Sequence, residues 1–273
     1  MSLDRRAVYP TRRIFEDVLR IISETDIKVD VITFVSDGEP TLDENLGNHL
    51  KVLKEIGIDT AVITNASIIW REDVRADLSQ ADIVSVKIDS VDERTWKKID
   101  RPHGDLSLGS ILDGISEFSE NYNGRLWTET MLVKGINDNL DTIERTVEFL
   151  EDLDAESNFI SVPIRPPAEE WVEIPDREKL DDAYMVFSRS LDNVTLMAGN
   201  ESGYFGSTGD VERDLLAICS VHPMREDSVM ELVRRSGGTM YEVNRLVREG
   251  ELEVASYRGT RFFRRKAPDE DGY

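Results

Sequence analysis

The sequence predicts an α/β fold: a parallel, partial (βα)6 barrel that lacks its first strand, followed by a small winged-helix-like domain. Short β-branched apolar runs alternate with amphipathic stretches, as in βα units. A Gly- and Ser-rich segment then separates this part from a shorter helical part. The apolar runs lie at 31–35, 60–64, 83–88, 126–133 and 158–163. The helical patterns lie at about 13–24, 43–56, 71–79, 107–122 and 139–152.

The chain opens on a helical pattern, TRRIFEDVLRIISE, whereas a parallel βα fold is expected to open on a strand. Either the first strand and its loop are missing, or this is an extra N-terminal helix. The pattern alone leaves both open. Asp43 and Gly57 predict the start and stop of the next helix, and Asp105 or Ser107 is expected to cap the helix at 107–122.

The barrel is assigned to residues 1–198, a linker to 199–210, the winged-helix-like domain to 211–266, and a disordered acidic tail to 267–273. In the third part, helical patterns are followed by two β-like runs, as in a winged helix. The expected wing, YRGTRFFRRK, has five basic residues and three aromatics, which would suit a nucleic-acid backbone. A solvated hairpin or an interaction surface is the alternative interpretation.

Composition limits the partners of the chain. The net charge of −22 argues against broad binding of nucleic acid or acidic membranes, so duplex DNA is an unlikely partner. The basic residues are 24 Arg and 9 Lys, and an acid-rich, lysine-poor chain suggests a salt-loving, halophile-like host. No apolar run approaches the roughly 20 residues that span a bilayer, and no signal segment is visible, so we expect no membrane partner and a cytoplasmic location.

Polar residues gather at the predicted carboxyl ends of the strands, where βα barrels place their sites. They are Ser36, Asp37, Gly38, Glu39 and Pro40 after the first run, Asn65 after the second, Lys87 and Asp89 on the third, Glu129 on the fourth and Arg165 after the fifth. Glu39 would orient a ligand amine, with Gly38 allowing close approach of the backbone. Turn chemistry without a ligand is the alternative for Glu39 and for Asn65.

Charged residues inside strand-like runs must pair or face a site, because burying an isolated charge costs several kcal/mol. Lys87 and Glu129 therefore form either a structural ion pair or part of a site. Lys87 is also a candidate Schiff-base lysine of a barrel lyase, with a pKa lowered by desolvation. Arg165 would place its guanidinium over an anion, or belong to a stiff Pro-rich loop.

Metal ligands are scarce. Cys219 is the single cysteine, so these 273 residues form no disulfide and no cysteine-built metal site. His49, His103 and His222 are separated in the pattern and are each expected to be structural. We predict no metal site in this chain.

Five motifs together resemble the radical SAM superfamily, in a branch related to the wyosine-synthesis enzymes that modify tRNA. They are VDVITFVSDGEPTLDENLG, AVITNAS, IDRPHGDL, ETMLVKGIND and PIRPPAEEWV, in this order, and the similarity runs over about residues 5–175. The resemblance implies a partial βα barrel that binds S-adenosylmethionine (SAM) across its mouth. It also implies a 4Fe–4S cluster, held by a Cys-x3-Cys-x2-Cys loop, that reduces SAM to a 5′-deoxyadenosyl radical in oxidoreductase-like chemistry.

The resemblance also implies roles for residues. Gly38, Glu39 and Pro40 match the segment that holds the methionine amino group of SAM, and Asn65 matches the next strand end.

Lys87 and Asp89 match positions that face the ribose or the methionyl carboxylate of SAM. Glu129, with Gly135 and Asn137 in the following turn, matches the place where the fifth strand of such barrels approaches SAM.

Two departures stand out: the cysteine loop is absent, and Lys87 replaces a common small hydroxyl residue. Arg165 would lie on the substrate side, and the catalytic candidates are Lys87, Glu129 and Arg165. Without three thiolates this chain is expected not to cleave SAM.

Three accounts remain open: a shortened form of a radical SAM enzyme, a cluster-less relative that keeps SAM or ligand binding, or an unrelated barrel lyase. An electron donor would be needed in the first case. The substrate, small or RNA-derived, stays open, and tRNA is a possible partner.

Overall fold

The computed structural model describes residues 3–35, 38–199 and 205–266, and the chain divides into two compact units. The first contains the residues up to Glu16, Asp30–Ile164 and Glu169–Gly199. The second contains Asp17–Val29, Arg165–Ala168 and the described residues from 205 onward. Ser36, Asp37, part of the expected linker and the expected tail at 267–273 lie outside the described residues.

A six-stranded parallel sheet organises the first unit, with the strands in chain order across the sheet. The strands are β1 (Val31–Phe34), β2 (Asp59–Thr64), β3 (Ile83–Lys87), β4 (Arg125–Met131), β5 (Ser157–Ser161) and β6 (Val194–Met197). This confirms the predicted parallel α/β fold. The register sets Lys87 of β3 beside Glu129 of β4.

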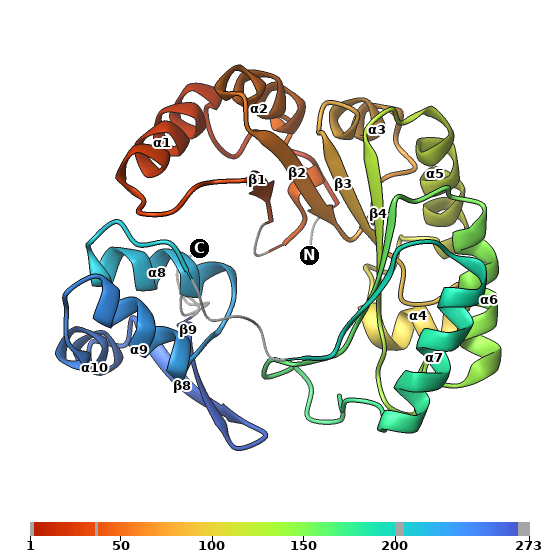
Figure 1. Ribbon diagram of the computed structural model, residues 1–273. Helices are drawn as coiled ribbons and strands as arrows, with labels where there is room; N and C mark the ends of the chain where they lie inside the picture. Colours follow the sequence, from red (N-terminus) through yellow and green to blue (C-terminus); the bar gives the residue numbers. More distant parts are fainter. Residues whose placement is uncertain (1–2, 36–37, 200–204, 267–273) are drawn as a thin grey trace. The chain divides into compact units, whose positions relative to one another are not determined.

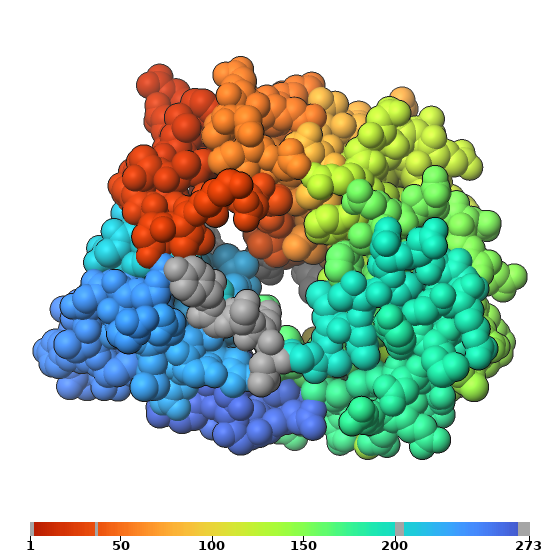
Figure 2. Space-filling view, viewed as in Figure 1, coloured from red at the N-terminus to blue at the C-terminus, as the bar shows by residue number. Residues whose placement is uncertain are grey.

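The helices that follow the strands cover one face of this sheet (Figure 1). They are α2 (Leu46–Leu53), α3 (Glu72–Leu78), α5 (Leu108–Asn121), α6 (Leu140–Glu151) and α7 (Arg177–Ser190). Helix α4 (Glu93–Asp100) lies beside the carboxyl end of β3, and α1 (Thr11–Glu24) precedes β1. The core lies between sheet and helices, where Val62 and Val84 of the strands meet apolar residues such as Leu50 and Ile115. In the space-filling view, the orange to yellow-green segments after β1 to β3 lie against one another on the face shown (Figure 2).

Three elements of the first unit were not expected from the sequence: α4, α7 and β6. Helix α4 buries one large side chain, Trp96, so its apolar pattern is too sparse to identify. Strand β6 alternates half-buried and exposed residues over only four positions.

The expected start of α2 at Asp43 is wrong. Asn45 is the N-cap of this helix, while Asp43 ends the short 3-10 helix η1 (Pro40–Leu42) that follows Glu39. The Asp43 carboxylate instead accepts the N–H of Asn45 at 2.8 Å and contacts His49 at 3.2 Å. Gly57 ends the short 3-10 helix η2 (Lys54–Ile56) with a φ of 78°, as expected of a left-handed stop.

The second unit contains three helices and a three-stranded antiparallel sheet of order β7-β9-β8. Its elements are α8 (Val211–Val221), β7 (Met224–Arg225), α9 (Glu226–Arg235), α10 (Met240–Arg248), β8 (Leu252–Tyr257) and β9 (Thr260–Arg265). Phe262 and Phe263 of the expected wing are buried. Arg264 donates to Glu253 at 2.5 Å and Arg261 pairs with Glu226, so two of the five basic residues of the expected wing have carboxylate partners here.

Candidate functional site

A buried carboxylate lies where β1 meets η1. Glu39 is 8% exposed and is the N-cap of η1. Its Oε1 accepts hydrogen bonds from the N–H of Thr41 at 3.1 Å, the hydroxyl of Thr41 at 2.8 Å and the hydroxyl of Thr64 at 2.6 Å. Its Oε2 accepts the N–H of Asn65 at 2.8 Å. All four donors are neutral, and burial raises the pKa of Glu39 despite them.

The neighbouring strand end, after β2, is shaped by a tight turn. Asn65 Oδ1 accepts the N–H of Ser67 at 2.9 Å, so the Asn65 side chain supports the turn while its main chain supports Glu39. Ala66 has a φ of 58°, in the left-handed region that favours glycine. The position therefore accepts alanine at a modest energetic cost.

Lys87, at the end of β3, forms an ionic cluster with two carboxylates. It donates to Asp89 and, at 2.7 Å, to Asp100 at the end of α4. Burial alone would lower the pKa of Lys87, but the two carboxylates raise it above its usual value. The raised pKa is opposite to the lowered value that a Schiff-base lysine would need, so the ion pairs with Asp89 and Asp100 argue against that role.

The other half of this cluster is Asp89, which is 2% exposed. Burial raises the pKa of Asp89 to about 6, and the nearby Asp100 carboxylate adds to this effect while Lys87 opposes it. Asp89 Oδ1 also accepts the N–H of Met131 at 2.9 Å, which fastens the end of β3 to the end of β4.

Asn137 completes the same junction. Its Nδ2 donates to the carbonyls of Asp89 and Met131, both at 2.8 Å, and its Oδ1 accepts the N–H of Val133 at 2.7 Å. Gly135 precedes it with a φ of 67°. The structure thus uses the Asn137 side chain inside the fold, and contact of Gly135 or Asn137 with SAM stays a prediction.

The other two charged candidates, Glu129 and Arg165, are not part of the ionic cluster around Lys87. Glu129, although in register with Lys87, accepts the hydroxyl of Ser161 at 2.7 Å, so the expected ion pair gives way to Lys87 with Asp89 and Asp100. Arg165 belongs to the second unit.

A cavity of about 390 Å³ in the first unit brings five of the predicted residues together. These are Gly38, Glu39, Asn65, Lys87 and Asp89. The sequence did not indicate other residues of the lining, which include Leu3, Trp96, Asp100, His103, Leu108, Ile111 and Ile115. Helical spacing at 108, 111 and 115 predicted the helix, but not that its apolar face borders a cavity as well as the core.

The cavity lining combines polar and apolar groups. The Glu39 carboxylate and the Lys87 ammonium provide opposite charges, and Trp96 and several leucines provide apolar surface. Such a combination is typical of sites for small polar ligands with an apolar or aromatic part. It suits an amino acid zwitterion joined to a flat apolar group.

Comparison with known proteins assigns this fold and site to a family. The model of the radical SAM superfamily matches residues 4–150. A UPF0026 protein of Methanocaldococcus jannaschii is 40% identical over 273 residues, which cover 99% of this chain and 85% of that protein. The chain therefore belongs to the radical SAM superfamily, which confirms the resemblance found in its motifs.

The chain is also similar to two further proteins. A probable dual-specificity RNA methyltransferase RlmN of Endomicrobium trichonymphae is 28% identical over 179 residues, covering 62% of this chain and 51% of that protein. The crystal structure of Streptococcus suis SuiB bound to S-adenosylmethionine covers 76% of this chain and 49% of that chain, with a TM-score of 0.54 at 15% identity. This last likeness shows the fold.

Membership implies SAM and a 4Fe–4S cluster, and the residues present fit them differently. The cavity with Glu39 and Lys87 fits SAM. The cluster has no ligands here: Cys219 is buried in the second unit, its thiol donates to the carbonyl of Phe263 at 3.5 Å, and burial raises its pKa to about 11. Across residues 3–35, 38–199 and 205–266, no group of three His, Cys, Asp or Glu side chains is placed to hold a metal.

No helix in the described part of the chain is both long and apolar enough to span a bilayer.

Proposed function

We propose that this chain is the SAM-binding body of a radical SAM enzyme, with Glu39 as the acceptor for the methionyl ammonium of SAM. The observation that carries the proposal is the buried Glu39 carboxylate, which borders the cavity and whose hydrogen-bond donors in the described structure are neutral. A buried carboxylate without a cationic partner is costly, and a ligand ammonium supplies that partner.

Lys87 supports the same orientation of the ligand. Its ammonium borders the cavity, and Asp89 and Asp100 accept two of its three N–H groups, which leaves the third for a ligand. The methionyl carboxylate of SAM would approach Lys87 while the methionyl ammonium approaches Glu39. The apolar wall around Trp96 is then left for the rest of the ligand.

The cluster thiolates, in this proposal, come from a Cys-x3-Cys-x2-Cys segment outside these 273 residues. Two facts support it: the single cysteine is buried elsewhere, and 85% of the Methanocaldococcus jannaschii protein is covered by the alignment, so that protein has further sequence. Leu3 borders the cavity, so a segment joined ahead of it would arrive beside Glu39. Sequencing the source DNA upstream of Met1 tests this part of the proposal, and a stop codon there without such a motif would favour the cluster-less alternative.

The substrate class is a separate question. The RlmN relative is named for RNA, which makes an RNA-derived substrate a natural candidate for this chain. The second unit does not favour it, because Phe262 and Phe263 are buried and Arg261 and Arg264 of its hairpin are paired with Glu226 and Glu253. We therefore keep RNA as the substrate to test first and expect no duplex-DNA binding.

Isothermal titration with SAM tests the proposed binding. We expect Glu39→Gln to weaken SAM binding by about 10- to 100-fold, the value of a charge-assisted hydrogen bond. Glu44→Gln is the matched control, because Glu44 is an exposed glutamate five positions further along the chain. Equal affinity of both variants would refute the assignment of Glu39.

A further inference from the structure

The segment that precedes α1 lies alongside the turn that carries Glu39. The N–H of Arg6 donates to the carbonyl of Leu42 at 2.9 Å, and the N–H of Glu44 donates to the carbonyl of Arg6 at 3.2 Å. Arg6 and Asp43 thus form an isolated parallel bridge. We call residues 3–9 the N-terminal strap.

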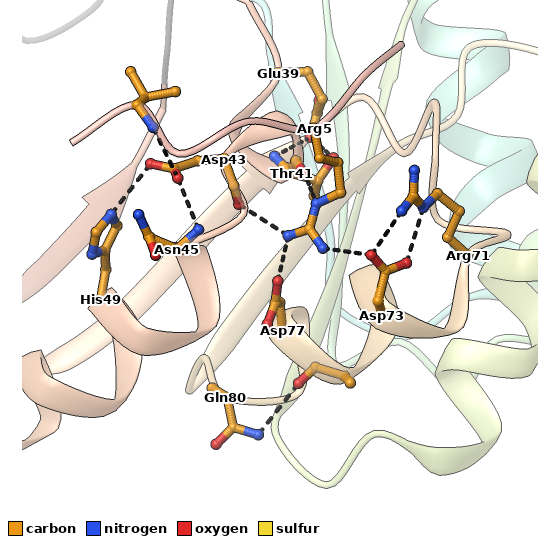
Figure 3. A network of polar contacts seen from close by, with 12 residues as sticks. Arg5, Glu39, Thr41, Asp43, Asn45, His49, Arg71, Asp73, Asp77 and Gln80 are labelled. Carbon is orange, nitrogen blue, oxygen red and sulfur yellow. Dashed lines mark hydrogen bonds and ion pairs between the residues drawn. The ribbon is translucent and has the colours of Figure 1, made fainter. Parts of the chain in front are cut away.

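Arg5 is the anchor of this strap, and its side chain is only 7% exposed (Figure 3). Its Nε donates to the carbonyl of Thr41 at 2.9 Å, and its Nη2 donates to the carbonyl of Asp43 at 2.9 Å. The other side of the guanidinium binds α3, with Nη1 2.8 Å from Asp73 and Nη2 paired with Asp77. One side chain therefore joins the strap, the η1 turn and α3.

The surrounding fold makes room for this anchor. Gly47 of α2 lies against Asp77, and a Cβ at this position would overlap the Asp77 carboxylate. Because residue 47 has no side chain, Asp77 can lie close to α2 and accept a hydrogen bond from Arg5. A buried guanidinium with two carboxylates and two carbonyls has its donors well used, which is the condition for burying such a charge.

Thr41 connects Arg5 to the candidate site. Its carbonyl accepts Arg5, while its N–H and its hydroxyl both donate to Glu39 Oε1. Arg5 and Glu39 therefore bind opposite sides of a single residue. Without Arg5, the η1 turn loses the contact that holds Thr41 in place, and with it the restraint that keeps the N–H and hydroxyl of Thr41 hydrogen-bonded to the Glu39 carboxylate.

We propose that Arg5 is a positioning residue for the SAM site, which acts through Thr41 to fix the orientation and hydrogen bonding of the Glu39 carboxylate. The proposal extends the function proposed above, because it rests on Glu39 as the ammonium acceptor. Arg5 itself is outside the cavity lining.

The direct readout is the titration of the Glu39 carboxyl group, followed by carbon-13 NMR on glutamate-labelled protein without any ligand. Removing Arg5 weakens two hydrogen bonds that favour the ionised carboxylate, so we expect Arg5→Met to raise the pKa of Glu39 further, by about one unit. At a pH below the pKa of Glu39 in the parent protein, the variant should then bind SAM about tenfold more weakly than the parent. The other charged or titratable residues that border the cavity are the same in every variant: Lys87 at the end of β3, Asp89 after it, Asp100 of α4, Arg101 and His103.

Arg71→Met is the matched control. Arg71 also binds Asp73, with two hydrogen bonds of 2.9 Å, but within the described residues it makes no hydrogen bond to the η1 turn. We expect this variant to leave the Glu39 titration and SAM affinity within about twofold of the parent. A general loosening of α3 would instead move both variants together, and that result would overturn the proposal.

Arg5→Lys is the second variant, in case Arg5→Met does not fold. It keeps the positive charge, but one ammonium cannot reproduce the guanidinium fork. We expect a shift of the Glu39 titration in the same direction but smaller. An unchanged Glu39 titration in a folded Arg5 variant would refute the positioning role. If the Glu39 titration shifts as expected but the parent protein does not bind SAM, only the proposed function is refuted.

Discussion

Lys87 and Asp100 join the end of β3 to the last residue of α4 through a hydrogen bond of 2.7 Å. A carboxylate at the carboxyl end of a helix is disfavoured by the helix dipole, and Lys87 offsets this. Because Asp89 and Asp100 raise the pKa of Lys87, its amine stays protonated at neutral pH. The ionic cluster therefore argues against Lys87 as the nucleophile of an aldolase-type lyase.

We accordingly expect no covalent adduct at Lys87. Incubation with aldehydes or ketones and borohydride, followed by peptide mass spectrometry, should leave Lys87 unmodified. Exposed Lys28 and Lys97 provide internal controls for nonspecific labelling. Selective labelling of Lys87 would contradict the ion-pair account.

SAM binding should release a proton where Glu39 is protonated in the free protein. Burial raises the pKa of Glu39 above its ordinary value of 4.5, and a bound ammonium favours the ionised carboxylate and so lowers that pKa. Affinity is therefore expected to rise as the pH rises through the pKa of the free protein. Titration calorimetry in buffers of different ionisation enthalpy measures the released proton, and Glu39→Gln should abolish that release.

Two glycines of α5 should differ sharply in their tolerance of alanine. A Cβ at Gly114 would lie 2.7 Å from the backbone N and Cα of Trp70, whereas at Gly109 it would meet only Ser107 Oγ at 3.8 Å. We expect Gly114→Ala to lower the free energy of unfolding by about 1–3 kcal/mol through overpacking. Gly109→Ala should be neutral or stabilising by up to about 1 kcal/mol, because alanine favours helix.

Chemical denaturation of the two variants measures these free energies. Equal stability of both would show that α5 does not pack against residues 69–70 as described.

The acidic surface should make stability depend on salt. At a net charge of −22 the excess carboxylates repel one another, and salt screens this repulsion. We expect a higher midpoint of thermal unfolding in molar KCl than in dilute buffer. Equal midpoints would remove the argument for a salt-loving host, which so far rests on composition.

The sequence predicted five of the six strands because apolar, β-branched residues are frequent in them, as at Val84 and Val86 of β3, and it missed β6. It also predicted that Glu39, Asn65 and Lys87 share one rim, since parallel strands end at one edge. Periodicity does not report side-chain partners, so it missed that Asp100 rather than Glu129 pairs with Lys87.

Long-range anchoring was equally invisible in the sequence. Arg5 binds Asp73 and Asp77, 68 and 72 positions away, and neither end has a local signal. Trp96 was missed because it is the single buried side chain of α4, and one buried residue sets no period.

The most direct test of the account is a crystal structure of this chain with SAM. We predict that the methionyl nitrogen lies within about 3 Å of a Glu39 carboxylate oxygen, with the methionyl carboxylate toward Lys87. SAM bound in another part of the molecule, with the Glu39 carboxylate still bonded only to Thr41, Thr64 and Asn65, would contradict the central claim.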